Sequence, residues 1–64
     1  MIVNGVVRES ETPTDVVSLL EEMGIEPRGI AVAINGEVVR RSQWTSTVIA
    51  SGDRVEIVTA VAGG

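Results

Sequence analysis

The sequence predicts an α+β domain in which a mixed sheet of four to five strands packs on one helix, in the order ββαβββ. Three observations support this fold class. Asn-Gly pairs at 4–5 and 35–36 lie between short apolar segments, a pattern typical of tight β-hairpins. Apolar residues between 13 and 23 recur with helical spacing. A segment beginning at Arg54 is rich in Val and Ile, which favour a buried strand.

Both hairpins are expected to use type I′ turns, because Asn and Gly tolerate the positive φ that such turns require. The first pairs strand 1–4 with strand 6–9, and the second pairs strand 30–34 with strand 37–40. In strand 30–34, bulky side chains alternate with small ones, so each kind occupies its own face of the sheet. The bulky row, expected to face the helix, is Ile30, Val32 and Ile34, and the small row is Ala31 and Ala33.

The helix is expected to span residues 13–23. Thr12 can cap its N-terminus, Pro13 suits the first helical position, and Asp15 takes the capping-box position. Gly24 is predicted to end the helix in a left-handed conformation, with Ile25 folding back on the last turn. The apolar stripe that would face the sheet consists of Val16, Leu19, Leu20 and Met23.

The last strand is expected to lie parallel to the first, because this places the most apolar strands in the middle of the sheet. The resulting arrangement is the β-grasp, or ubiquitin-like, fold, with residues 1–64 forming one domain and a flexible Gly-Gly tail. One sheet face then has no helix over it. We interpret its smooth apolar surface as a partner-docking site, although scattered alanines on a surface also need no special explanation. The residues expected there are Ala31, Ala33, Val58 and Ala60.

The segment 41–49 has no clear periodicity. Trp44 is the chain's single aromatic residue, and it has two interpretations: a ring that closes one edge of the core, or a contact residue at an interface. Val48 and Ile49 are expected to enter the core. The preceding pair at 40–41, both Arg, fits either a partner contact or a solvated loop.

The composition excludes several kinds of function. Among 64 residues there is no Cys and no His, so the chain lacks a thiol nucleophile and the commonest general base. Catalysis by the chain alone, and a metal site built on Cys or His, are therefore not expected. The formal net charge of −4 disfavours nucleic acid and anionic membranes as partners. Without a signal peptide or a membrane-length apolar run, a cytoplasmic protein is expected.

The sequence ends in two glycines, Gly63 and Gly64. Because glycine has no Cβ, this tail can enter a narrow channel in a partner's active site and present the carboxylate of Gly64 there. Glycine-rich ends also occur without any function, since chain termini tolerate change. The tail alone leaves both interpretations open.

Five segments together resemble the ThiS family, the sulfur carrier proteins of thiamine biosynthesis. The resemblance covers essentially the whole chain, and it departs from the family pattern at Arg40, where the family commonly has Pro before Arg. The segments are Ile2-Val3-Asn4-Gly5, Val32-Ala33-Ile34-Asn35-Gly36-Glu37-Val38-Val39, Arg41-Ser42-Gln43-Trp44, Ser51-Gly52-Asp53-Arg54-Val55-Glu56-Ile57-Val58 and Val61-Ala62-Gly63-Gly64.

The resemblance implies a carrier that is a substrate of its partner enzymes and not itself an enzyme. An E1-like adenylating enzyme of the ThiF type would use ATP to adenylate the Gly64 carboxylate. A sulfur donor protein would then convert the adenylate into a thiocarboxylate, from which a thiazole synthase of the ThiG type takes the sulfur. No cofactor is expected to bind the chain, because ATP is used by the partner.

Three alternatives remain open from the sequence. The chain can be a carrier for another sulfur pathway, such as the small subunit of molybdopterin synthase, with the same chemistry at Gly64. It can be a ubiquitin-like protein modifier, although the absence of Lys excludes chains built on its own lysines. It can also be a plain binding module whose tail has no role. Sulfur transfer, lysine-linked adducts and deletion of the two glycines distinguish these alternatives.

Overall fold

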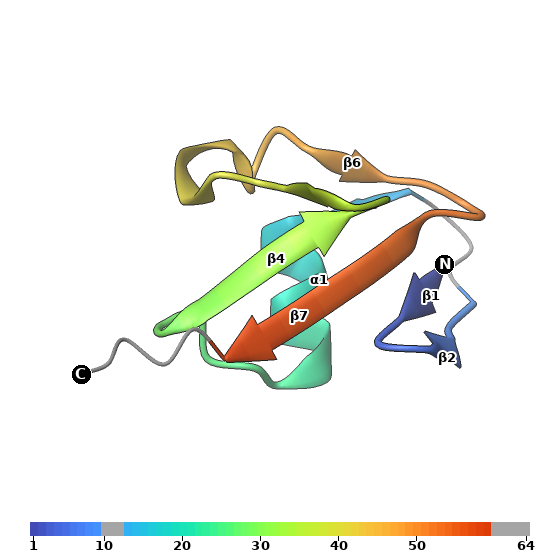
Figure 1. Cartoon of the computed structure of the whole chain (residues 1–64), viewed down its shortest axis with the longest axis horizontal. Helices are drawn as coiled ribbons and strands as arrows, with labels where there is room; N and C mark the ends of the chain where they lie inside the picture. Colours follow the sequence, from blue (N-terminus) through green and yellow to red (C-terminus); the bar gives the residue numbers. More distant parts are fainter. Residues whose placement is uncertain (10–12, 60–64) are drawn as a thin grey trace.

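A mixed five-stranded sheet forms one layer of the fold, and an eight-residue helix forms the other (Figure 1). The computed structural model describes residues 1–9 and 13–59. The large sheet contains β1 (Ile2–Val3), β2 (Val6–Val7), β4 (Ile30–Ile34), β5 (Glu37–Val38) and β7 (Arg54–Thr59). The other elements are β3 (Thr14–Asp15), α1 (Val16–Met23), the 3₁₀-helix η1 (Arg41–Gln43) and β6 (Val48–Ile49).

The strand order β2-β1-β7-β4-β5 confirms the predicted β-grasp topology. β1 and β7 pair in parallel in the middle of the sheet, with Ile2 opposite Arg54 and Val3 opposite Val55. The other pairings within this sheet are antiparallel. The parallel pair requires a crossover, and α1 lies on that crossover connection. The longest strand, β7, therefore lies between β1 and β4.

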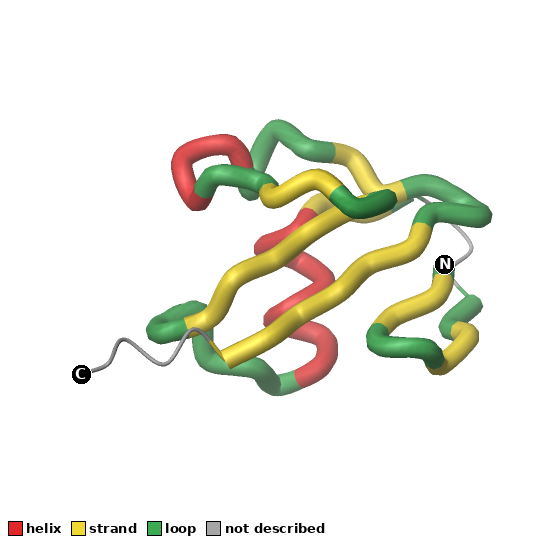
Figure 2. Tube along the Cα trace, in the orientation of Figure 1, coloured by secondary structure: helices red, strands yellow, loops and turns green. Residues whose placement is uncertain are grey.

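The core lies between the sheet and α1, and its residues are aliphatic apart from one Trp. Figure 2 shows the helix behind the two longest strands, which is the side on which these residues meet. The prediction that bulky residues of strand 30–34 face the helix is confirmed, since Val32 is fully buried and its bulky neighbours pack against the same core. The buried residues are Val3, Val16, Leu19, Leu20, Val32, Trp44, Ile49, Val55 and Ile57.

The predicted start of the helix is wrong. The structure begins α1 at Val16, and Asp15 is its N-cap, with Oδ1 accepting a hydrogen bond from the Ser18 backbone N–H at 2.7 Å. The reason is that Thr14 and Asp15 form strand β3, which pairs with β6 and holds the backbone extended up to the cap. Thr12, the expected cap, lies outside the described residues.

The predicted end of the helix is confirmed. Gly24 has φ 70° and donates its N–H to the last carbonyls of the helix. The N–H of Ile25 bonds to the Leu20 carbonyl at 2.9 Å, and Ile25 packs against the core. Both features belong to the left-handed caps in which glycine avoids the steric penalty of a Cβ.

The two hairpin turns lie where the Asn-Gly pairs predict them. Asn4 and Gly5 have φ 50° and 81°, and the pair at 35–36 has φ 52° and 86°. The flanking strands are shorter than expected: β1 and β2 have two residues each, and β5 ends at Val38 rather than at residue 40. Beyond Val38 the chain turns into η1, with the Val39 N–H still bonded to the Val32 carbonyl.

The small sheet formed by β3 and β6 was not predicted. It pairs Thr14 with Ile49 and Asp15 with Val48. Successive strand residues face opposite sides, so Ile49 is buried whereas Val48 is 62% exposed. The expectation that both enter the core is therefore wrong for Val48.

Candidate functional site

Over residues 1–9 and 13–59, no helix lies over one face of the five-stranded sheet. In Figure 1, α1 lies behind β4 and β7, so the face of these strands that is turned to the viewer is the one without a helix. Strand alternation determines which side chains point to this face: Val32, Val55 and Ile57 are buried on the helix side, so the residues between them point away. We call this surface the open face and define it by Ala31, Ala33, Val38, Glu56 and Val58.

The open face contains a shallow hollow of about 200 Å³. Strand register brings its walls together, because β7 places Val58 opposite Ala31 and Glu56 opposite Ala33, while β5 places Val38 opposite Ala33. The two alanines form a low floor because a methyl group leaves the space that a larger side chain would fill. Two valines project beside it, with exposures of 74% for Val38 and 55% for Val58. An exposed apolar surface with low relief is suited to contact with another protein.

The predicted docking residues are brought together only in part. Ala31, Ala33 and Val58 lie on the open face as expected and line its hollow. Ala60, Gly63 and Gly64 lie outside the described residues. The last described residue is Thr59 at the end of β7, directly after Val58. The open face thus extends to the point in the sequence where the predicted tail segment begins.

Val38, Gly36 and Glu56 also line this hollow, and these contributions were not predicted from the sequence. The signal was present for Val38. A two-residue hairpin loop at 35–36 fixes residue 33 opposite residue 38, and that pairing puts both on one face. Alternation along β7 puts Glu56 on the same face as Val58. Its place opposite Ala33 required the register between β4 and β7, which depends on contacts between segments far apart in the chain.

Two asparagine side chains fix β7 from its two edges. Asn4 donates from Nδ2 to the Ile57 carbonyl at 3.1 Å and accepts from the Ile57 N–H at 2.8 Å. On the other edge, Asn35 Oδ1 accepts from the Arg54 N–H at 3.0 Å, and the Asn35 backbone N–H bonds to the Arg54 carbonyl at 2.8 Å. A carboxamide has the same donor and acceptor groups as a peptide, so each asparagine extends the pairing with β7 beyond the end of the strand that precedes it.

Asp53 stabilises the turn that precedes β7. Its Oδ2 accepts from the Ala50 N–H at 2.8 Å, and its Oδ1 accepts from Asn35 Nδ2 at 3.0 Å. Both hydrogen bonds favour the ionised carboxylate, and the one from Ala50 has the larger effect. They hold the pKa of Asp53 below its ordinary value of 3.8. The start of β7 therefore carries a localised negative charge.

Trp44 is a core residue, which decides between its two predicted roles. Its side chain is 3% exposed, and Nε1 donates to the Val39 carbonyl at 3.0 Å. The Arg41 guanidinium lies 5.5 Å from the centroid of the indole ring, a separation at which a cation is attracted to the ring face. Arg40 is exposed to solvent.

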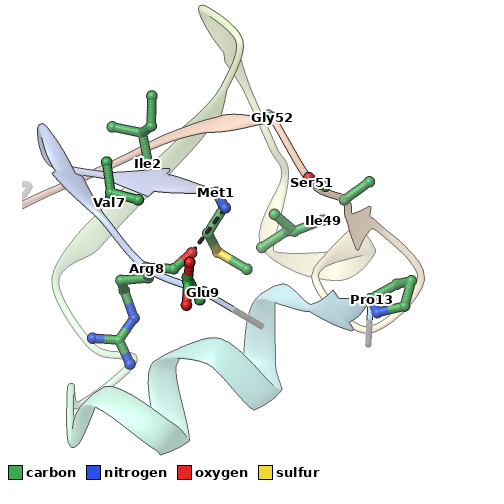
Figure 3. A pocket seen from close by; sticks show the side chains of 10 residues that line it. Met1, Ile2, Val7, Arg8, Glu9, Pro13, Ile49, Ser51 and Gly52 are labelled. Carbon is green, nitrogen blue, oxygen red and sulfur yellow. Dashed lines mark hydrogen bonds between the residues drawn. The ribbon is translucent and has the colours of Figure 1, made fainter. Parts of the chain in front are cut away.

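A larger hollow, of about 700 Å³, lies beside the first hairpin (Figure 3). Its apolar walls come from Ile2, Val7 and Ile49, and Arg8 and Glu9 are the charged side chains among the described residues that line it. Arg8 is paired with Glu22 at 3.4 Å, and the Arg8 carbonyl accepts from the Met1 nitrogen at 2.9 Å. The Arg8 side chain, the Arg8 carbonyl and the Met1 nitrogen are thus engaged in contacts within the chain.

The described part of the chain contains no group of three or more carboxylates that could hold a metal ion. Over residues 1–9 and 13–59, no helix has the length and apolar character needed to cross a membrane.

The sequence of the whole chain, residues 1–64, matches the ThiS family. The chain belongs to the ThiS family. A solved structure agrees with this assignment: the crystal structure of the thiamine biosynthesis protein ThiS from Geobacter metallireducens is 29% identical in sequence, with a TM-score of 0.85. The match covers 98% of this chain and 96% of that one.

Two further ThiS-related proteins show how the domain occurs elsewhere. The sulfur carrier protein ThiS of Thermus thermophilus is 38% identical over 61 residues, covering 95% of this chain and 94% of that protein. A thiazole synthase of Paramagnetospirillum magneticum is 34% identical over 64 residues. That match covers 100% of this chain but 20% of the thiazole synthase, so the chain spans a fifth of the length of that relative.

Proposed function

We propose that this chain is a sulfur carrier of thiamine biosynthesis that carries sulfur as a thiocarboxylate on Gly64. The observation that carries the proposal is membership of the ThiS family over residues 1–64, a range that includes both terminal glycines. The relative from Thermus thermophilus is named as a sulfur carrier protein. The composition suits this role, because a chain without Cys and His relies on partner enzymes for its chemistry.

The proposed chemistry follows from the low reactivity of a carboxylate. An E1-like enzyme of the ThiF type transfers AMP from ATP to the Gly64 carboxylate and releases pyrophosphate, which creates an acyl adenylate. Sulfur at the sulfide level, delivered by a donor protein, then attacks the acyl carbon; the new carbon–sulfur bond forms as the bond to AMP breaks, which leaves the thiocarboxylate and free AMP. The two glycines suit the approach of both reagents, since neither carries a Cβ that would obstruct the carboxyl carbon.

In this proposal the open face docks on the adenylating enzyme. Val38 and Val58 are exposed apolar side chains beside a low floor formed by Ala31 and Ala33. Residues 60–64 follow β7 directly in sequence, so a partner bound on the open face has the tail close to its own surface. Ala60 would continue the same apolar surface.

A thiazole synthase of the ThiG type is the proposed acceptor of the sulfur. The support is that a relative named thiazole synthase contains a segment matching this entire chain. A segment joined covalently to an enzyme is held close to it, which raises its effective concentration.

Intact-mass spectrometry tests the carrier function directly. The chain is incubated with ATP, sulfide and a ThiF-type enzyme, and the modified residue is then located by fragmentation. We expect a mass gain equal to the exchange of one oxygen for sulfur, located at Gly64. A variant lacking Gly63 and Gly64 is the control, and it should remain unmodified. If the full chain stays unmodified with every adenylating enzyme of its source organism, the proposal is wrong.

The acceptor is tested separately from the carrier step. The thiocarboxylate form is mixed with thiazole synthase or with the large subunit of molybdopterin synthase. We expect sulfur transfer to the first and little to the second. The reverse result would assign the chain to another sulfur pathway, and lysine-linked adducts on other proteins would indicate a protein modifier.

Gly64→Ala tests the role of the slender tail. The described sheet and core consist of residues between 1 and 59, so we expect the unfolding midpoint not to change. The rate of adenylation should fall severely, because the methyl group obstructs a channel that accepts only glycine. Adenylation at the wild-type rate would contradict the threading step while leaving the carrier function intact.

A further inference from the structure

The two Asn-Gly turns share a chemical property that sulfur transfer does not use. The side-chain amide of an asparagine can be attacked by the backbone nitrogen of the next residue, and glycine offers the least obstruction because it has no Cβ. In this chain both glycines are open: a Cβ added at Gly5 or at Gly36 would meet nothing within 4 Å. Both turns are therefore candidates for spontaneous deamidation.

The surroundings of the two asparagines differ. Asn4 and Asn35 are both exposed residues, but the two side-chain hydrogen bonds of Asn4 are partly buried, and both go to Ile57 in the middle of β7. The hydrogen bonds of Asn35 are exposed to solvent, and they go to Arg54 and to the carboxylate of Asp53. Water therefore reaches the carboxamide of Asn35 more readily than that of Asn4.

We propose that Asn35 is a site of spontaneous deamidation, which adds a negative charge beside Asp53 at the start of β7. The Gly36 backbone nitrogen loses its proton to solvent base and attacks Cγ of Asn35, so that a nitrogen–Cγ bond forms. The Cγ–Nδ2 bond breaks, and Nδ2 takes up a proton and leaves as ammonia. Water then opens the resulting succinimide to aspartate or isoaspartate. One water is consumed and one ammonia released, without any oxidation or reduction.

The local geometry makes this modification consequential. Asn35 Nδ2 donates to Asp53 Oδ1 at 3.0 Å, whereas the ionised product has only acceptor oxygens at that position. Two carboxylates would then face each other and repel. Asp53 also holds the Ala50 N–H at 2.8 Å in the turn before β7. Because Gly36 lines the hollow of the open face, the new charge also lies beside the surface proposed for docking.

The asparagine of the first turn is the matched control within the same molecule. The full chain is incubated at mildly alkaline pH, with and without urea, and peptides containing each asparagine are followed by mass spectrometry. In the folded protein we expect residue 35 to react several-fold faster than residue 4, and in urea the two rates should converge. The proposal fails if residue 4 reacts first in the folded protein. It also fails if residue 35 reacts only in urea.

Two variants test the effect of the added charge. Asn35→Asp mimics the product, and Asn35→Gly removes the carboxamide without adding a charge while still tolerating the φ of 52° at this position. We expect Asn35→Asp to lower the midpoint of thermal unfolding by about 4–8 °C, the shift typical of a moderate loss in so small a domain, and Asn35→Gly to lower it less. Equal midpoints would show that the new charge does not act on Asp53, and would overturn that part of the proposal.

Discussion

The two faces of the five-stranded sheet are built from the same strands, yet they carry different side chains. On the covered face, Val32 and Val55 are fully buried and Ile57 is 9% exposed. On the open face, the alternating positions of the same strands carry Ala31, Ala33, Glu56 and Val58. The side chains of the covered face are large and apolar. Those of the open face include two small alanines and a carboxylate, and they are accessible to solvent.

This difference separates residues that form the fold from residues available for contact. The side chains of the covered face lose their water through packing on α1, so burial within the chain explains their apolar character. Val38 and Val58 remain more than half exposed, so burial within the chain does not explain theirs. The proposed docking surface follows from that contrast.

The largest difference should appear between truncation of a core residue that packs under the covered face and truncation of a residue on the open face. Leu20 is 2% exposed in the core, and Leu20→Ala should lower the free energy of unfolding by about 2–5 kcal/mol through lost burial and a residual cavity. Val58→Ala should cost about 1 kcal/mol or less, mainly through strand propensity. Urea denaturation measures both. Equal losses would show that Val58 contributes to the core, and the two faces would then not be distinct.

A charge on the open face should separate binding from stability. Val58→Asp should weaken binding to the adenylating enzyme at least tenfold, about 1.4 kcal/mol, because an apolar contact surface would have to bury a carboxylate. Val6→Asp is the matched control: Val6 is 64% exposed, and its partner Val3 faces the core, so it lies on the other side of the sheet. Isothermal titration measures the affinities. Equal weakening by both variants would contradict docking through the open face.

The topology could be predicted because its determinants are local. The two Asn-Gly pairs identify both hairpins of the five-stranded sheet. The alternation of bulky and small residues in strand 30–34 identifies which of its faces packs on the helix. Gly24 marks the helix end, where positive φ is required. The parallel pairing of β1 and β7 then follows from placing the most apolar strands in the middle of the sheet.

The small sheet of β3 and β6 could not be predicted from local pattern. Two-residue strands carry no periodicity, and these two are separated by more than thirty residues of chain. Their pairing also determined where the helix begins, because it keeps Asp15 extended although Pro13 suits the first position of a helix. Local preference there was overridden by pairing with a distant strand.

The candidate site divides in the same way. Ala31, Ala33 and Val58 could be placed on one face from strand alternation, and Val38 could have been placed there from the hairpin register. The side-chain bonds of Asn4 to Ile57 required the three-dimensional structure, because they join residues 53 positions apart. The chemistry at Gly64 rests on family resemblance, since no pattern in the described residues specifies it.

The helix cap should have a smaller effect that concerns only the covered face. Asp15→Ala removes the acceptor of the Ser18 N–H, so it should lower the free energy of unfolding by about 1 kcal/mol. Asp15→Asn keeps an acceptor oxygen and should restore most of the loss. Urea denaturation measures stability, and binding to the adenylating enzyme should be unchanged, because the cap lies away from the open face. Weaker binding of the adenylating enzyme by the folded Asp15→Ala variant would show that the helix cap also influences the open face.

The smallest expected effect concerns pH and the start of β7, the strand shared by both faces. The pKa of Asp53 is lower in the folded chain than its ordinary value of 3.8, so its ionised form stabilises the fold. This contribution is fully present above the unfolded pKa and is lost as pH falls from about 3.8 through the lower folded value. Asp53→Asn lacks the charge, and its unfolding midpoint in urea should therefore decline less than that of the wild type across this interval. Parallel curves for the two proteins would mean that the hydrogen bonds from Ala50 and Asn35 do not favour the ionised carboxylate.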